Sequence, residues 1–176
     1  MGFAPPARHP DLDAPTCELD RLALALDCKL SKIRADRQDL AEPTNWLAPA
    51  AEEDLVAIRS KWQLPETYEE FLRKFSPLKV TVTGRGFGTG LHMLGASELV
   101  SGQAGYAYNS TENRPIEDWP SEYLVIGDVF ADPHILDLSA TKAVDTPVLT
   151  APHGVRVWRF QSVTPTFLAF LRRLAR

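Results

Sequence analysis

The most regular apolar pattern in the chain lies between Pro65 and Phe75. Tyr68, Phe71, Leu72 and Phe75 recur at the i, i+3, i+4 and i+7 spacing that places side chains on one face of a helix. Pro65 suits the first turn, because the N–H that proline lacks would have no helical partner there. The pattern predicts a short amphipathic helix that buries an aromatic stripe and lies across a β-sheet.

A longer helical pattern precedes it, from Thr16, the predicted N-cap, to Asp39. Its apolar residues recur at spacings of three and four: Leu19, Leu22, Leu26, Leu30 and Ile33. Small or apolar residues also lie on the opposite side: Cys17, Leu24, Cys28 and Ala35. Two interpretations are open. These residues are scattered and half-exposed, or they form a second apolar strip that contacts another chain and makes a homodimer through the Thr16–Asp39 helix.

The remaining N-terminal segments set the domain organisation. Residues 1–15 contain four prolines and little to bury, which predicts a flexible or loosely docked tail. Residues 16–48 form a helical elaboration that ends in a linker from Pro43 to Pro49. Residues 50–176 form the core of a single domain, which begins with a second helix that turns Leu55, Ile58 and Trp62 inward.

A glycine-rich stretch, residues 84–90, connects two segments with strand patterns, residues 79–83 and residues 91–94. The alternation of β-branched residues in the first segment predicts a hairpin. A phosphate-binding loop is the alternative, but it needs Gly-x-Gly-x-x-Gly followed directly by a helix. Here Thr89 occupies the last glycine position and a strand-like segment follows. The pattern favours a hairpin turn.

Further apolar runs complete a sheet. Residues 123–126 predict a central strand, and residues 134–138 its partner. Residues 147–150 and 155–158 flank Pro-His-Gly and predict a third hairpin. Thr164 is the predicted cap of a last helix. The order predicts an α+β fold: a single domain with a twisted, mainly antiparallel sheet, with N-terminal helices and a C-terminal helix packed around it.

Composition narrows the class of protein. The 176 residues are 44% hydrophobic and 24% charged, as in ordinary globular domains, and the formal charge of -4 argues against a nucleic-acid partner. No apolar run approaches the roughly 18 residues of a membrane span, and no export signal is visible.

Cys17 and Cys28 would lie about 16 Å apart on one helix, too far for a disulfide. Reduced thiols predict a cytoplasmic protein.

Catalytic and metal-binding patterns do not stand out in the sequence. The four histidines are far apart, without His-Glu-x-x-His or Cys/His ligand spacing. One group of residues has the composition of a metal site: Asp128, Asp132, His134 and Asp137. The flanking apolar runs favour a hairpin instead. Ser97 lacks the final glycine of a nucleophile elbow. We therefore expect no enzyme activity, no metal and no cofactor.

Several motifs together resemble the SUKH superfamily, which includes fungal Smi/Knr cell-wall regulators and bacterial immunity proteins. They are Trp62-x-Leu64-Pro65-x-x-Tyr68-x-x-Phe71-Leu72, Trp119 before residues 123–128, residues 134–137, Pro147-Val148, and residues 163–171. The match covers roughly residues 50–176. The resemblance implies an immunity protein that binds a cognate bacterial toxin in the cytoplasm of the producing cell and neutralises it by occluding its active site. The fungal relatives imply the alternative, a non-enzymatic regulatory protein–protein interaction module.

The family does not fix the contact residues, so candidates come from the chemistry of the chain. An acidic segment with two aromatic residues supplies Tyr108, Glu112, Glu117, Asp118, Trp119 and Glu122. One interpretation is an aromatic-anchored acidic patch for a basic toxin cleft. The other is a solvated loop in which Trp119 is buried as a core anchor. Arg85 and Phe87, in the glycine-rich turn, are a second candidate because exposed loop tips often carry recognition.

Overall fold

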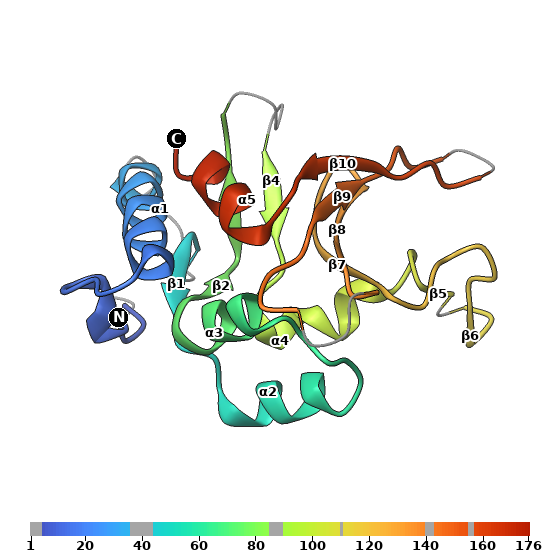
Figure 1. The fold of residues 1–176 in the computed structure, drawn as a ribbon, viewed down its shortest axis with the longest axis horizontal. Helices are drawn as coiled ribbons and strands as arrows, with labels where there is room; N and C mark the ends of the chain where they lie inside the picture. Colours follow the sequence, from blue (N-terminus) through green and yellow to red (C-terminus); the bar gives the residue numbers. More distant parts are fainter. Residues whose placement is uncertain (1–4, 36–43, 85–89, 110, 140–142, 155–156) are drawn as a thin grey trace.

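The computed structural model describes residues 5–35, 44–84, 90–109, 111–139, 143–154 and 157–176. Its centre is a six-stranded antiparallel sheet with the order β10-β9-β8-β7-β4-β3 (Figure 1). The strands are β3 (Val80–Val82), β4 (Leu91–Met93), β7 (Tyr123–Val129), β8 (Asp132–Asp137), β9 (Val148–Thr150) and β10 (Gln161–Thr164). The predicted central strand is confirmed, because β7 lies between β4 and β8 and its residues 124–127 are buried.

Two small sheets accompany the large one. They pair β1 (Trp46–Ala48) with β2 (Ser76–Leu78), and β5 (Tyr108–Asn109) with β6 (Arg114–Pro115). The predicted linker is therefore wrong at β1, where Leu47 is buried. Asn45 directs the chain into this strand with a φ of 60°, and its side chain accepts a hydrogen bond from the Thr81 N–H.

The helices gather around the large sheet. They are α1 (Glu18–Ala35), α2 (Glu52–Arg59), α3 (Glu66–Phe75), α4 (Ala96–Leu99) and α5 (Phe167–Leu174), with 3-10 turns η1 (Pro10–Leu12) and η2 (Ser101–Gln103). Helices α1, α3 and α5 contact one another, and α5 lies in front of the sheet in Figure 1. The described chain is a single α+β domain, as predicted.

Helix α3 buries the predicted aromatic stripe. The ring of Phe167 on α5 lies 4.9 Å from that of Tyr68 and 5.2 Å from that of Phe71. The placement of α3 differs from the prediction, because its main contacts are with α1, α5, β1 and β2. Helix α5 is the one that packs on the sheet, where Phe170 lies 5.7 Å from His134 of β8.

The described part of the N-terminal segment is docked on the domain, so of the two predicted alternatives it is not a flexible tail. Leu12 is buried in the core, and the ring of His9 packs edge-on against Phe75. Arg8 pairs with Asp27 at 3.1 Å. The apolar and ionic contacts of residues 8–12 with α1 and α3 hold this described part of the segment against the domain.

Helix α1 starts later than predicted, and its outer face stays exposed. Thr16 does not act as the cap; instead the Asp20 carboxylate accepts hydrogen bonds from the N–H groups of Thr16 and Cys17. Cys17 and Cys28 are exposed and reduced, while Leu24 is partly buried against the core. Residues 36–39 lie outside the described chain, and the homodimer stays a prediction.

The third hairpin pairs a later segment than predicted. Strand β9 pairs with β10, so Ser162 opposes Leu149, and residues 157–158 are not in a strand. The ring of Trp158 lies 5.3 Å from that of Trp119, which holds this part of the chain in an aromatic cluster instead.

The last helix also begins later than predicted. The Thr166 hydroxyl caps α5 by accepting from the Ala169 N–H at 3.1 Å, whereas Thr164 belongs to β10. Asp145 satisfies two further N–H groups, those of Phe167 and Leu168. This second cap comes from a loop 22 residues away, so the local pattern did not reveal it.

Candidate functional site

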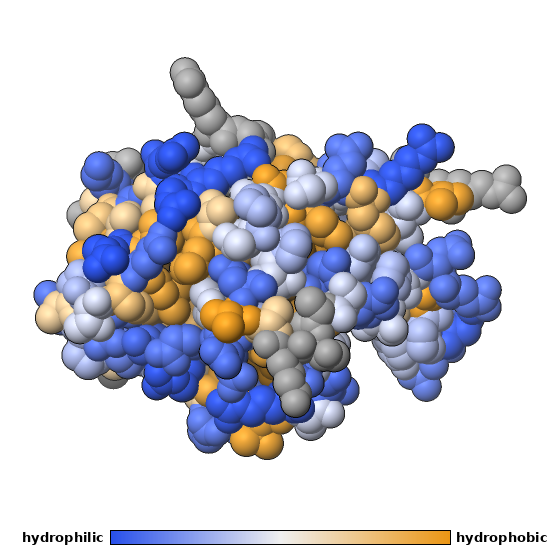
Figure 2. Space-filling view, in the orientation of Figure 1, coloured by the Kyte–Doolittle hydropathy of each residue, from blue (hydrophilic) through white to orange (hydrophobic). Residues whose placement is uncertain are grey.

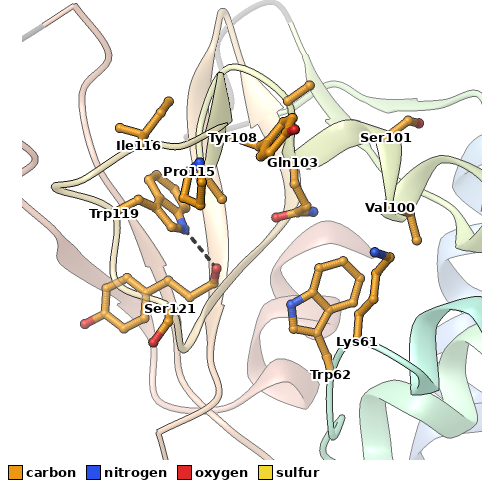
Figure 3. A pocket seen from close by; sticks show the side chains of 13 residues that line it. Lys61, Trp62, Val100, Ser101, Gln103, Tyr108, Pro115, Ile116, Trp119 and Ser121 are labelled. Atoms are coloured by element: carbon orange, nitrogen blue, oxygen red, sulfur yellow. Dashed lines mark hydrogen bonds between the residues drawn. The ribbon is translucent and has the colours of Figure 1, made fainter. Parts of the chain in front are cut away.

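A cavity of about 700 Å³ opens between α2 and the segment that carries β5 and β6 (Figure 3). In the space-filling view the surface is notched between these parts of the molecule (Figure 2). The surface that lines the cavity is mostly apolar. The lining residues are Lys61, Trp62, Val100, Ser101, Gln103, Ala104, Ala107, Tyr108, Pro115, Ile116, Trp119, Ser121 and Tyr123. The volume falls within the usual range of ligand pockets and is also large enough for several side chains of a partner.

The turn from α2 to α3 supplies one wall. The N–H groups of Lys61 and Trp62 both donate to the carbonyl of Ile58, which closes the C-terminal end of α2 and sets the backbone of the two residues. Leu64 is buried just beyond them, and Pro65 sets the start of α3. Trp62 is only partly buried and faces the cavity (Figure 3).

Trp119 supplies the opposite wall and is also part of the core. Its side chain is 8% exposed, and its indole Nε1–H donates to the carbonyl of Tyr123 at 3.0 Å. The backbone N–H of Trp119 donates to the carbonyl of Ile116. This placement agrees with the second interpretation of Trp119, a core anchor, while one side of the residue still lines the cavity.

Gln103 ties the floor of the cavity to the central strand. Its side-chain amide donates to the carbonyls of Leu99 and Val125 at 2.8 and 2.9 Å, and its Oε1 accepts from the Val125 N–H. A buried side chain with this many hydrogen bonds fixes η2 against β7. The cavity is therefore formed before any ligand binds.

Aromatic rings extend from the cavity along the sheet. Trp119 contacts Tyr106, Trp158 and Phe160, with centroids 6.0, 5.3 and 5.6 Å away. Tyr123 packs edge-on against Phe160 at 4.7 Å. Burial raises the pKa of Tyr106 to about 12, with a further contribution from the charges of Asp128 and Asp132, so its phenol is neutral at physiological pH.

Four exposed acidic residues belong to the segment that lines the cavity, and we call them the acidic rim: Glu112, Glu117, Asp118 and Glu122. Glu117 and Asp118 lie between the lining residues Ile116 and Trp119. Arg114 pairs with Glu112 at 2.7 Å and with Glu117 at 3.3 Å. Asp118 forms no ion pair with any residue that the structure describes.

Two of the candidate residues lie at the cavity in the structure. Tyr108 and Trp119 line the cavity, and the acidic rim lies next to them in the chain. Arg85 and Phe87 lie outside the described residues. The sequence did not identify Lys61, Gln103 or the cavity-facing side of Trp62. The helical spacing of Trp62 with Leu55 and Ile58 predicted that its side chain is buried, but not that it faces a cavity.

Groups suited to metal chemistry do not converge in the described part of the chain. It contains no cluster of three or more His, Cys, Asp or Glu residues that could hold a metal ion. Asp128, Asp132 and Asp137 lie on the β7–β8 hairpin, as the apolar pattern predicted. Nor is any helix among the described residues long and apolar enough to cross a membrane.

Sequence comparison identifies the class of protein. The SMI1 / KNR4 family (SUKH-1) matches residues 49–173, which include α2, α3, the large sheet and nearly all of α5. The chain therefore belongs to the SMI1 / KNR4 family, and the suspected SUKH relationship is confirmed. Helix α1 precedes the matched region. Neither a search of curated proteins nor a search of solved structures found a match.

Proposed function

We propose that this protein is an immunity protein that binds a cognate bacterial toxin in the cytoplasm of the producing cell and occludes the active site of the toxin. Membership of the SMI1 / KNR4 (SUKH-1) family supports the proposal. The observation that carries it is the apolar cavity of about 700 Å³ between Trp62 and Trp119, lined by the segment that contains the acidic rim. Aromatic anchors within a charged rim are typical of tight protein interfaces.

The mechanism is stoichiometric binding without turnover. The hydrogen bonds of Trp119 and Gln103 fix the cavity walls, so little conformational entropy is lost when a partner segment enters. The acidic rim favours a partner segment that carries lysine or arginine, and the methylene stems of these side chains suit the apolar walls. Such a contact inhibits the toxin by binding alone.

Co-expression with the product of the neighbouring gene tests the proposal. We expect restored growth and a 1:1 complex that co-purifies. A toxin that is active alone, is not neutralised and forms no complex would contradict the proposal and favour the regulatory interaction module.

Charge reversal then tests the position of the contact. We expect Glu117→Lys combined with Asp118→Lys to raise the dissociation constant at least about tenfold, mainly because association becomes slower. This effect should depend on the salt concentration. The matched control is Asp13→Lys combined with Glu53→Lys, at exposed positions that do not line the cavity. Each reversal adds two charges, so both double variants have a formal net charge of zero. Equal affinity of the two variants would exclude the acidic rim as the contact.

A further inference from the structure

The turn between β7 and β8 is made of residues that its backbone disfavours. Val129 pairs with Asp132, so only Phe130 and Ala131 connect the strands. Their φ angles are 50° and 69°, the left-handed values of a type I′ turn. Such turns favour Asn-Gly, and a bulky side chain in this region is an outlier. Phe130 and Ala131 therefore make this turn less stable than Asn-Gly would.

The surrounding structure holds this turn in place. The Asp128 carboxylate accepts a hydrogen bond from the Ala131 N–H at 3.1 Å. Asp132 accepts from the His153 N–H at 2.7 Å, and its Oδ1 lies 2.6 Å from His153 Nδ1. The two strands also lie in the middle of the large sheet. A backbone outlier persists where its surroundings determine the conformation, and such outliers concentrate at functional sites.

The strained turn presents an exposed aromatic ring. Phe130 is 68% exposed, which makes it the most exposed large hydrophobic residue in the described part of the chain and the only aromatic one in that group. Phenylalanine has few rotatable bonds, so its immobilisation in a complex costs little entropy. A rigid turn with an exposed ring is well suited to anchor a protein contact.

We infer that Phe130 is a preformed anchor that inserts into an apolar pocket with a basic rim on the toxin. This inference rests on the proposed function and adds a second contact to the cavity. Asp128 and Asp132 precede and follow Phe130 by two residues in the chain, and their carboxylates provide the charge complementarity for a basic rim. A two-fold contact between copies of this chain would bring the same carboxylates together, which disfavours a second copy as the occupant.

The double variant Phe130→Asn with Ala131→Gly separates stability from binding, because it installs the residues that the turn prefers. We expect its Tm to rise by about 2–4 °C. We expect its affinity for the purified product of the neighbouring gene to fall at least about tenfold, as for the loss of a buried aromatic anchor. The control Val144→Asn removes another exposed apolar side chain, of 63% exposure, and should leave the affinity within about twofold.

Four results would overturn the inference. Unchanged affinity in the double variant, with a wild-type protein that binds, would exclude the anchor and leave the proposed function intact. A lower Tm in the double variant would show that Phe130 and Ala131 do not destabilise the turn. Sedimentation that shows self-association of the wild-type chain but not of the double variant would identify a second copy as the occupant. A wild-type protein that does not bind the gene product would remove the proposed function and this inference together.

Discussion

Lys74 on α3 lies 3.2 Å from the Asp20 carboxylate on α1, and Asp20 has no exposed surface. The same ammonium group lies 2.6 Å from Asp11 and 2.9 Å from Glu70. Asp20 also accepts the N–H groups that precede α1. One buried carboxylate therefore fixes the start of α1 and joins it to the helix that carries the family motif, although α1 lies outside the matched region.

Replacement of Asp20 by Asn should destabilise the fold by about 2 kcal/mol at pH 7, because it removes one of the three carboxylates around Lys74 and weakens the start of α1. Burial raises the pKa of Asp20, but hydrogen bonds from Thr16, Cys17 and Lys74 outweigh it and hold the pKa well below its usual value of 3.8. A carboxyl group with a lowered pKa in the folded state stabilises the fold above about pH 4, and this contribution is lost as the pH falls further.

Guanidinium unfolding at pH 7 and at steps between pH 4 and pH 2 measures this contribution. The difference in unfolding free energy between wild type and Asp20→Asn should shrink over the acidic range. Asp13→Asn is the control, because the Asp13 side chain is 74% exposed. A difference that stays constant with pH would show that Asp20 contributes through packing rather than charge.

Local periodicity predicted the elements whose contacts are local in the sequence. The spacing of Tyr68, Phe71 and Phe75 identified α3 and its buried face, and the apolar run at residues 123–126 identified the central strand. The role of Lys74 was not predictable, because a basic residue near a helix end also suits the helix dipole. Its partner Asp20 is 54 residues away, and only the packing of α1 on α3 brings the two charges together.

The candidate site shows the same division. Tyr108 and Trp119 were candidates because they are close together in the chain, and both line the cavity. Trp62 comes from a turn more than 40 residues earlier, and its helical spacing indicated only burial. Amphipathic periodicity specifies which side of a helix turns inward, but a partly buried residue at its end faces a cavity only because of the tertiary fold.

A buried histidine in β8 predicts a loss of stability in mild acid. Burial, with a smaller contribution from the charge of Arg173, lowers the pKa of His134 to about 4 against the opposing effects of Asp132 and Asp128. The unfolded chain takes up the proton near the usual pKa of 6.5, so the folded state loses stability as the pH falls from 6.5 towards 4. The full effect is about 3 kcal/mol.

Urea unfolding at pH 7, 5.5 and 4.5 checks this sign. We expect His134→Gln to reduce the slope of stability against pH in this range, whatever its stability at pH 7. His92→Gln, at a half-exposed position in β4, is the control and should keep the wild-type slope. Parallel pH profiles for wild type and His134→Gln would contradict the prediction.

Gly127 in β7 leaves too little room for a methyl group against the neighbouring strand β4. A Cβ atom there would lie 2.3 Å from the carbonyl oxygen of His92, which is backbone and cannot rotate away. We expect Gly127→Ala to cost about 3 kcal/mol, because β4 and β7 must separate.

Gly105→Ala provides the contrast for this steric effect. Its φ is +87°, but no atom of the described residues lies within 4 Å of a Cβ built there. Only the conformational cost of about 1 kcal/mol applies. Denaturant midpoints of the two variants, with unchanged m-values, measure the difference. Equal losses would show that the contact between β4 and β7 adapts to a methyl group.

The hydroxyl group of Tyr68 predicts a variant that is more stable than the wild type. Tyr68 is 2% exposed, and its hydroxyl has no hydrogen-bond partner among the described residues. Burial also raises the pKa of Tyr68, so the group stays neutral. Because an unsatisfied buried hydroxyl opposes folding, we expect Tyr68→Phe to raise the free energy of unfolding by about 1 kcal/mol.

The ring of Tyr68, by contrast, stabilises the core through its edge-on contact with Phe167 at 4.9 Å. Tyr68→Leu removes this contact and should cost about 2 kcal/mol, so the two variants shift the denaturant midpoint in opposite directions. A loss of stability in Tyr68→Phe would mean that the hydroxyl is hydrogen-bonded in solution. The aromatic residue in the family motif would then act through its polar group as well as its ring.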